Sequence, residues 1–139
     1  MVRPFVLILM AGLLMATSSL AQDNLASARY VIKQQIIAFL NDDVESAYSF
    51  TAPGIQKVFP EPQRFFDMVK QRYEPVYRPG NYAFGRALGE ADGGTIAQEL
   101  LITGPKGKNW RAVYVLERQD SGDYRITGVR LSSIKGSSI

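Results

Sequence analysis

The sequence predicts an α+β fold in which N-terminal helices pack on a curved antiparallel sheet of four or more strands. Two observations lead to this prediction. Apolar residues recur every three or four positions in the first half of the chain, and every two positions after Pro79-Gly80. Three turn-forming clusters, at residues 92–94, 104–107 and 120–123, then divide the second half into segments of similar length. Helices followed by sequential strands are typical of the α+β class.

The first predicted helix is amphipathic. Its apolar residues lie three and four apart: Leu25, Ala28, Ile32, Ile36, Phe39 and Leu40. We expect Asp23 or Asn24 to cap its start, because a short polar side chain can accept from the first free backbone N–H groups. Residues 41–43, Asn-Asp-Asp, are expected to end it.

Two shorter helices are expected between this helix and the first strand. Residues 44–50 form the first of them, because the Thr-Ala-Pro-Gly sequence at residues 51–54 stops a helix. Residues 64–74 form the next, between the proline-rich cluster at residues 59–62 and Pro75. The N-terminal half is therefore helical and interrupted.

Four strands are expected in the second half, at residues 82–90, 95–103, 110–118 and 124–132. The Asp-Ser-Gly-Asp sequence before Tyr124 is the strongest hairpin signal, because glycine can adopt the positive φ that closes a short loop. Gly85 and Gly89 inside the first strand predict bulges that bend the sheet. A bent antiparallel meander can form a concave face.

The third strand carries apolar residues on both of its faces. Trp110, Ala112, Tyr114 and Leu116 alternate with Arg111, Val113, Val115 and Glu117. Neither face is polar at its middle, so both are expected to be partly covered. One face would take the long helix, and the other the remaining helices, a partner subunit or a ligand.

The first 21 residues have the layout of a secretory signal peptide. Arg3 precedes an apolar run at residues 5–16, and Ser19-Leu20-Ala21 is a small-x-small cleavage site. The run is shorter than the roughly 20 residues that span a bilayer, which favours cleavage over a retained anchor, the alternative. We expect one mature domain from Gln22 to residue 139, periplasmic or secreted, with no stable membrane anchor.

Composition limits the chemistry. The chain has no histidine and no cysteine, which removes the usual bases, nucleophiles and metal ligands. Without Arg3, 15 basic residues stand against 13 acidic ones, a scattered +2 that does not indicate nucleic-acid binding. The glycines at residues 104–107 and 85–89 lack the spacing and the following helix of nucleotide-binding motifs. No metal, cofactor or nucleic acid is therefore expected.

Seven side chains are candidates for lining a ligand pocket: Tyr73, Tyr77, Arg78, Tyr82, Glu99, Trp110 and Tyr114. An aromatic body with a polar tip suits amphipathic small molecules. The alternative for each aromatic is ordinary core or sheet surface. Glu99 is the carboxylate most able to point into a cavity, whereas Asp42 and Asp43 are expected to cap or turn a helix.

In these segments the chain resembles the bacterial domain of unknown function family 4864 of exported proteins, which is similar to the nuclear transport factor 2-like superfamily. The resemblance covers nearly all of the mature domain. It is carried by residues 38–43, 47, 52–53, 55, 59, 65–69, 73–76, 110–114 and 122–128. It implies a cone-like, cystatin-like roll whose curved sheet wraps the long helix, and it supplies no catalytic residues.

Three functions remain open at this point. The first is a periplasmic binding or accessory module that holds a small apolar or amphipathic ligand in the cone. The second is an interaction protein that forms a homodimer through the open sheet face. The third is an isomerase or dehydratase-like enzyme, which would need a buried carboxylate within reach of a tyrosine. The lack of histidine and cysteine places the enzyme last.

Overall fold

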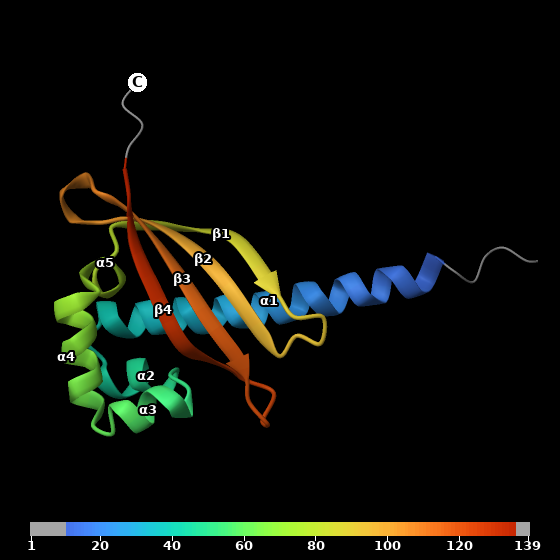
Figure 1. Cartoon of the computed structure of the whole chain (residues 1–139), viewed down its shortest axis with the longest axis horizontal. Helices are drawn as coiled ribbons and strands as arrows, with labels where there is room; N and C mark the ends of the chain where they lie inside the picture. The colour runs from blue at the N-terminus through green and yellow to red at the C-terminus, as the bar shows by residue number, and fades with distance from the viewer. Residues whose placement is uncertain (1–10, 136–139) are drawn as a thin grey trace, which may run out of the picture.

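The computed structural model describes residues 11–135, with side chains described from Leu20 onward. Five α-helices precede four β-strands, with a 3-10 turn between the second and third strands. Figure 1 shows the helices gathered beneath and at one end of the sheet. The α+β class is therefore confirmed. Arg3 and residues 5–10 of the predicted signal peptide lie outside the described residues.

Helix α1 is Ala11–Leu40, so the predicted start near Asp23 or Asn24 is wrong. Residues 13–24 contain neither proline nor glycine and are rich in leucine and alanine, so nothing interrupts the helix there. The N-terminal part of α1 projects beyond the sheet (Figure 1). Within residues 11–135, no helix combines the length and the apolar character needed to cross a membrane.

Helix α2, Val44–Ser49, forms where it was predicted. Its N-cap is Asp43, whose Oδ1 accepts from the Ser46 backbone N–H at 3.2 Å, as expected of a capping aspartate. Helices α3 (Pro53–Val58), α4 (Pro62–Arg72) and α5 (Glu74–Tyr77) follow.

Helices α3 and α5 were not predicted. Each of α3, α4 and α5 has a proline in its first two positions, where the missing N–H would have no partner in any case. Pro53 and Pro75 therefore begin helices, although the sequence suggested that they end them.

The sheet is an antiparallel meander of four strands in the order β1-β2-β3-β4, as predicted. The strands are β1 Asn81–Gly89, β2 Thr95–Thr103, β3 Asn109–Arg118 and β4 Tyr124–Ile134. A bulge at Gly85 in β1 confirms one predicted bend, whereas Gly89 pairs regularly with Ile96. A second bulge, between Val115 and Leu116 of β3 and the facing β4, was not predicted.

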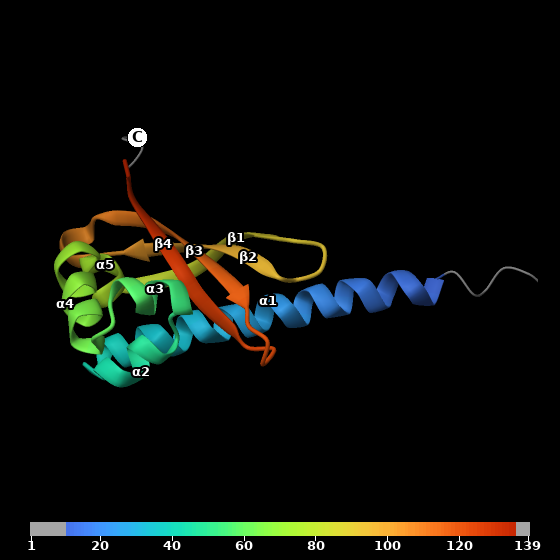
Figure 2. The ribbon, with the colours of Figure 1, turned by 60° about the horizontal axis from the view of Figure 1, so that its bottom comes forward.

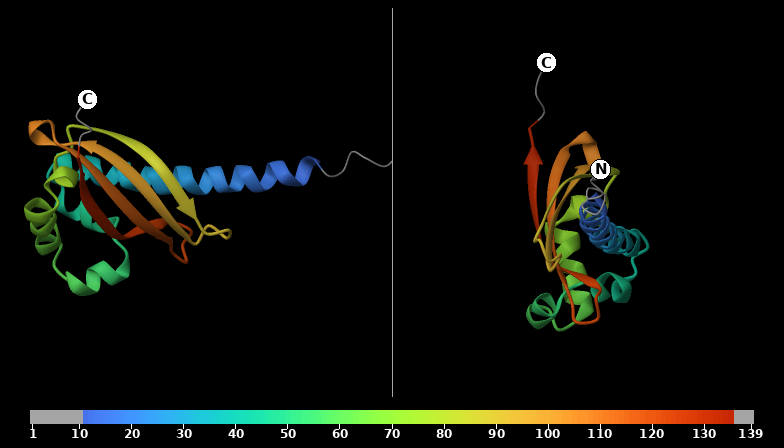
Figure 3. Two further views of the ribbon diagram at one scale, coloured as in Figure 1. Left: turned by 45° about the horizontal axis from the view of Figure 1, so that its top comes forward. Right: turned by 90° about the vertical axis from the view of Figure 1, so that its right-hand side faces the viewer.

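The hydrophobic core lies between the helices and the inner face of the sheet (Figure 2). Inner-face side chains from three strands are at most 4% exposed: Ile96, Gln98, Leu100, Ile102, Ala112, Tyr114, Leu116, Tyr124 and Ile126. They pack against Ala28, Ile32 and Ile36 of α1. The helices lie on this side of the sheet, and no described element covers the outer face (Figure 3).

Candidate functional site

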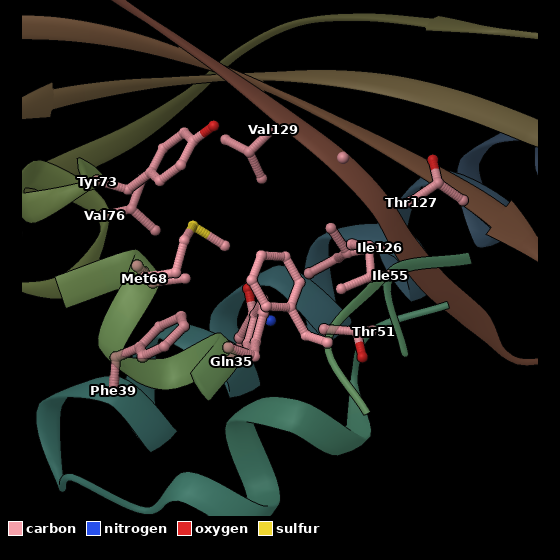
Figure 4. Close-up of a pocket in the computed structure, with 14 residues that line it drawn as sticks. Gln35, Phe39, Thr51, Ile55, Met68, Tyr73, Val76, Ile126, Thr127 and Val129 are labelled. Carbon is pink, nitrogen blue, oxygen red and sulfur yellow. The ribbon is translucent and has the colours of Figure 1, made fainter. Parts of the chain in front are cut away.

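A cavity of about 220 Å³ lies between the helices and strand β4. Five structural segments contribute to it: α1, α3 with its flanking residues, α4, α5 with Tyr73, and β4 (Figure 4). Its lining is Gln35, Phe39, Thr51, Ile55, Phe59, Phe65, Met68, Val69, Tyr73, Val76, Ile126, Thr127, Gly128 and Val129. Most of these side chains are apolar, and no ionisable acid or base other than Tyr73 is among them.

One buried amide brings polarity into the cavity. Gln35 is 3% exposed, and its Nε2 donates to the Ala47 carbonyl at 3.1 Å. No donor to its Oε1 is found within the described part of the chain, so this acceptor is free for a group in the cavity. Figure 4 shows the Gln35 amide at the floor of the cavity, with Tyr73 on the opposite side near Val129.

Strand β4 forms one wall because the chain before α3 pairs with its edge. The Ala52 N–H donates to the Ile126 carbonyl, and the Ile126 N–H donates to the Phe50 carbonyl, both at 2.8 Å. The resulting parallel bridge joins Thr51 to Ile126. It holds the start of α3 against the sheet, so that Ile55 closes the cavity from that side.

The predicted pocket residues do not converge. Tyr73 alone among the seven lines the cavity. Tyr82 and Trp110 border a surface depression where β1 and β3 begin and β2 ends. Trp110 and Tyr73 also share an open groove beside the cavity.

Tyr77 and Arg78 fix the end of helix α1 and do not line the cavity. The Tyr77 hydroxyl donates to Asp42 Oδ1 at 2.5 Å, and Arg78 Nη2 lies 2.9 Å from the same oxygen. Arg78 also donates to the Phe39 carbonyl, at the last turn of α1, and stacks 3.9 Å from the Tyr77 ring centre. Asp42 adopts a positive φ of 52°. The hydrogen bond from Tyr77, and to a smaller extent the one from Arg78, lowers the pKa of Asp42.

Asp42→Asn is expected to flatten the acid limb of the stability curve. Because the pKa of Asp42 is lower in the folded chain, its contribution is complete above the ordinary carboxyl pKa and is lost as the pH falls through the lowered value. Urea unfolding at a series of pH values from neutral to acid measures this. Tyr77→Phe, which removes the main cause, should flatten the same limb. An unchanged slope in both variants would contradict the assignment.

Glu99 lies on the outer face of the sheet, away from the cavity. Residue alternation along β2 decides this, because its neighbours Gln98 and Leu100 face the core. Its Oε2 lies 3.2 Å from Arg111 Nε, and its side chain passes directly over Gly85. Glu99 therefore pairs with a cation on the neighbouring strand.

Tyr114 is part of the core. It is fully buried on the inner face of β3, and its hydroxyl is the one buried side-chain polar atom of the described residues that has no hydrogen-bond partner. Burial, with a smaller contribution from Tyr82, raises the pKa of Tyr114. An unpaired buried hydroxyl costs stability without contributing a contact.

Tyr114→Phe is therefore expected to stabilise the fold, by roughly 1 kcal/mol. Denaturant unfolding measures the change. Tyr124→Phe is the matched control, because the Tyr124 hydroxyl donates to the Gly93 carbonyl and accepts from Arg118 at 3.0 Å. That variant should lose about 1 kcal/mol. Two losses of similar size would show that the Tyr114 hydroxyl has a partner after all.

Sequence reasoning missed most of the cavity lining. Gln35 carried a usable signal, since it lies three residues after Ile32 and thus on the apolar face of the first helix. A polar residue at such a position needs a partner or a ligand. Met68 and Val129 carried no signal, because each reads as ordinary core. Within residues 11–135, no group of three or more acidic residues could hold a metal ion.

These features define the class of protein: an α+β chain with an open four-stranded antiparallel sheet, helices on its inner face and an apolar cavity between the two layers. The chain belongs to the family described as Domain of unknown function (DUF4864), whose family model matches residues 21–139. Comparison with curated proteins gives no match, and comparison with solved structures gives none either.

Proposed function

We propose that this protein binds a small apolar or amphipathic molecule in the cavity between the helices and β4. The observation that carries the proposal is an apolar space of about 220 Å³ lined by Gln35, whose Oε1 accepts no hydrogen bond from a described residue. Ligand sites are typically apolar pockets with a few placed polar groups. A well-packed core of this size holds few voids larger than a water molecule.

The volume limits the ligand. An apolar cavity of about 150 Å³ accommodates benzene, so about 220 Å³ corresponds to an apolar group of roughly eight or nine carbon atoms. Phe39 and Phe65 offer aromatic surface to such a group. A larger ligand would extend through the open side of the cavity, next to Tyr73.

The proposal includes an exported, periplasmic location. It rests on the signal-like layout of residues 1–21, with cleavage between Ala21 and Gln22. The family model begins at residue 21, next to this bond. The helices on one face of a bent sheet are also what a nuclear transport factor 2-like cone would have, so we propose membership of that superfamily as well.

Val129→Phe is expected to abolish binding while leaving the fold intact. The larger ring enters the existing cavity, and filling a cavity commonly changes stability by about 0.5–2 kcal/mol in the favourable direction. Native mass spectrometry of protein purified from its own compartment, before and after denaturation, detects a bound molecule and its loss. The same samples show whether cleavage follows Ala21.

The matched control is Val113→Phe, on the outer face of the neighbouring strand. It makes the same substitution away from the cavity and should retain the ligand. Val129→Phe protein that still carries the bound mass would place the ligand elsewhere. Val129→Phe protein that loses several kcal/mol would mean that the space is already filled by the protein's own side chains.

A second candidate function is homodimerisation through the outer sheet face. The face is free of described helices, and its centre combines the half-buried Val113 and Val115 with the Glu99–Arg111 ion pair, which is self-complementary across a two-fold axis. Sedimentation at tens of micromolar tests it. A dimer that Val113→Asp dissociates supports it, and a monomer at that concentration contradicts it.

The enzyme alternative receives no support from the cavity. No aspartate or glutamate lines the cavity, and the described residues that are buried and polar are Gln35, Thr51 and Gln98. The tyrosine–carboxylate pair that does form, Tyr77 with Asp42, lies at the end of α1 outside the cavity. We therefore propose a binding function.

A further inference from the structure

A basic groove lies directly beside the cavity. It runs between the end of α4, the loop after β2 and the β4 edge, and it shares Tyr73 and Val129 with the cavity lining. Since both hollows are bounded by the same two side chains, a molecule that fills the cavity and extends past Tyr73 enters the groove.

Cations predominate in the groove. Arg72, Lys106, Lys108 and Arg130 border it, against one acidic residue, Glu74. The four cations are exposed, and none of them makes a salt bridge with a described residue. Unpaired cations around a concave surface create a local positive potential that attracts anions.

The local backbone conformation brings the cations to the rim of the groove, and one of them lies over an aromatic ring. Lys106 takes φ of 68° in the 3-10 turn Pro105–Gly107, a tight conformation that brings Lys106 and Lys108 to the same rim. Lys108 Nζ lies 4.9 Å from the Trp110 ring centre, so the ammonium is held over the groove wall. Arg72 approaches from the last turn of α4.

We propose that the ligand is an amphipathic anion, with its apolar part in the cavity and its carboxylate or phosphate in the basic groove. This inference rests on the proposed binding function and adds the charge of the ligand to it. An apolar cavity alone selects by size, whereas a cationic rim at its open side selects for a negative head group.

Titration calorimetry with octanoate and 1-octanol at neutral pH tests the inference. The two probes share an eight-carbon chain, within the size that the cavity allows, and differ in charge. We expect octanoate to bind on the order of tenfold more tightly, since each exposed charge contact contributes modestly. The preference should shrink as salt is raised.

Arg72→Gln/Lys108→Gln should reduce this preference to about twofold or less. The control, Arg86→Gln/Lys33→Gln, also removes one arginine and one lysine, both exposed and outside the groove, and should keep it. Equal affinities for the two probes would overturn the anion inference while leaving the cavity proposal in place. A preference for octanoate that survives in the groove variant would overturn it as well. If neither probe binds, and native mass spectrometry finds the same bound mass, or none, in both Val129→Phe and the wild type, both proposals are overturned.

Discussion

Phe39→Ala is expected to remove about 3–5 kcal/mol from the free energy of unfolding, the largest effect of any single change considered. Phe39 is 1% exposed, and its ring centre lies 5.5 Å from that of Phe66 and 6.2 Å from that of Tyr77. The loss combines the transfer of a buried ring with an enlarged cavity. A domain of this size has about 5–15 kcal/mol in total, so the variant should be close to unfolding at 37 °C.

Urea unfolding followed by Trp110 fluorescence measures the loss. Tyr30→Ala is the control on the same helix, because Tyr30 is 62% exposed and its truncation should change stability by less than about 0.5 kcal/mol. Since Phe39 also lines the cavity, the variant gains apolar space, and benzene should raise its midpoint more than that of the wild type. A loss below about 1.5 kcal/mol would show that the aromatic cluster repacks around the gap.

Gln98→Met is expected to cost about 2–3 kcal/mol, although it replaces a polar core residue with an apolar one of similar shape. Gln98 is fully buried on the inner face of β2. Its Oε1 accepts from Arg29 Nε at 2.9 Å. Its Nε2 donates to the Glu99 carbonyl at 2.7 Å, and lies 3.3 Å from the carbonyls of Gly85 and Arg86. Methionine leaves a half-buried guanidinium and the carbonyls of the β1 bulge without their partner.

A double-mutant cycle separates this explanation from simple loss of packing. In Arg29→Met/Gln98→Met the unpaired cation is gone as well. We therefore expect the double variant to lose at least about 1 kcal/mol less unfolding free energy than the sum of the two single losses. Arg29 also stacks 5.1 Å from the Phe84 ring centre, a contact that methionine can partly replace. Strict additivity would show that Arg29 and Gln98 act independently.

The sheet could be predicted closely because the turn-forming residues that end its strands are local sequence signals. Residues 95–103 were expected as a strand and form β2 with the same limits, since Gly93 and Gly104 lie just outside them. The helix starts were harder, because proline at 53 and 75 is compatible with either end of a helix. The early start of α1 was missed because no helix-breaking residue separates the signal-like segment from the amphipathic segment.

The candidate site was much less predictable. Tyr73 was expected and does line the cavity, but Tyr77 and Arg78 are occupied by Asp42, and Tyr114 is core. The cavity lies between α1, α4 and β4 and is closed on one side by the start of α3, an arrangement that is a property of tertiary packing. No residue type marks such a position, so ordinary core residues such as Val129 become the lining.

The pairing of α1 with β4 has a consequence for the order of folding. Helix α1 packs against β4, the last strand of the described chain, and also against β2, α2 and α5. Contacts between such distant segments form late, because a long loop must close before they are made. During synthesis the part of α1 that faces β4 therefore has no permanent partner until β4 has emerged. Chains that stop before β4 should remain open and sensitive to proteases, so the native core assembles only once the whole chain is available.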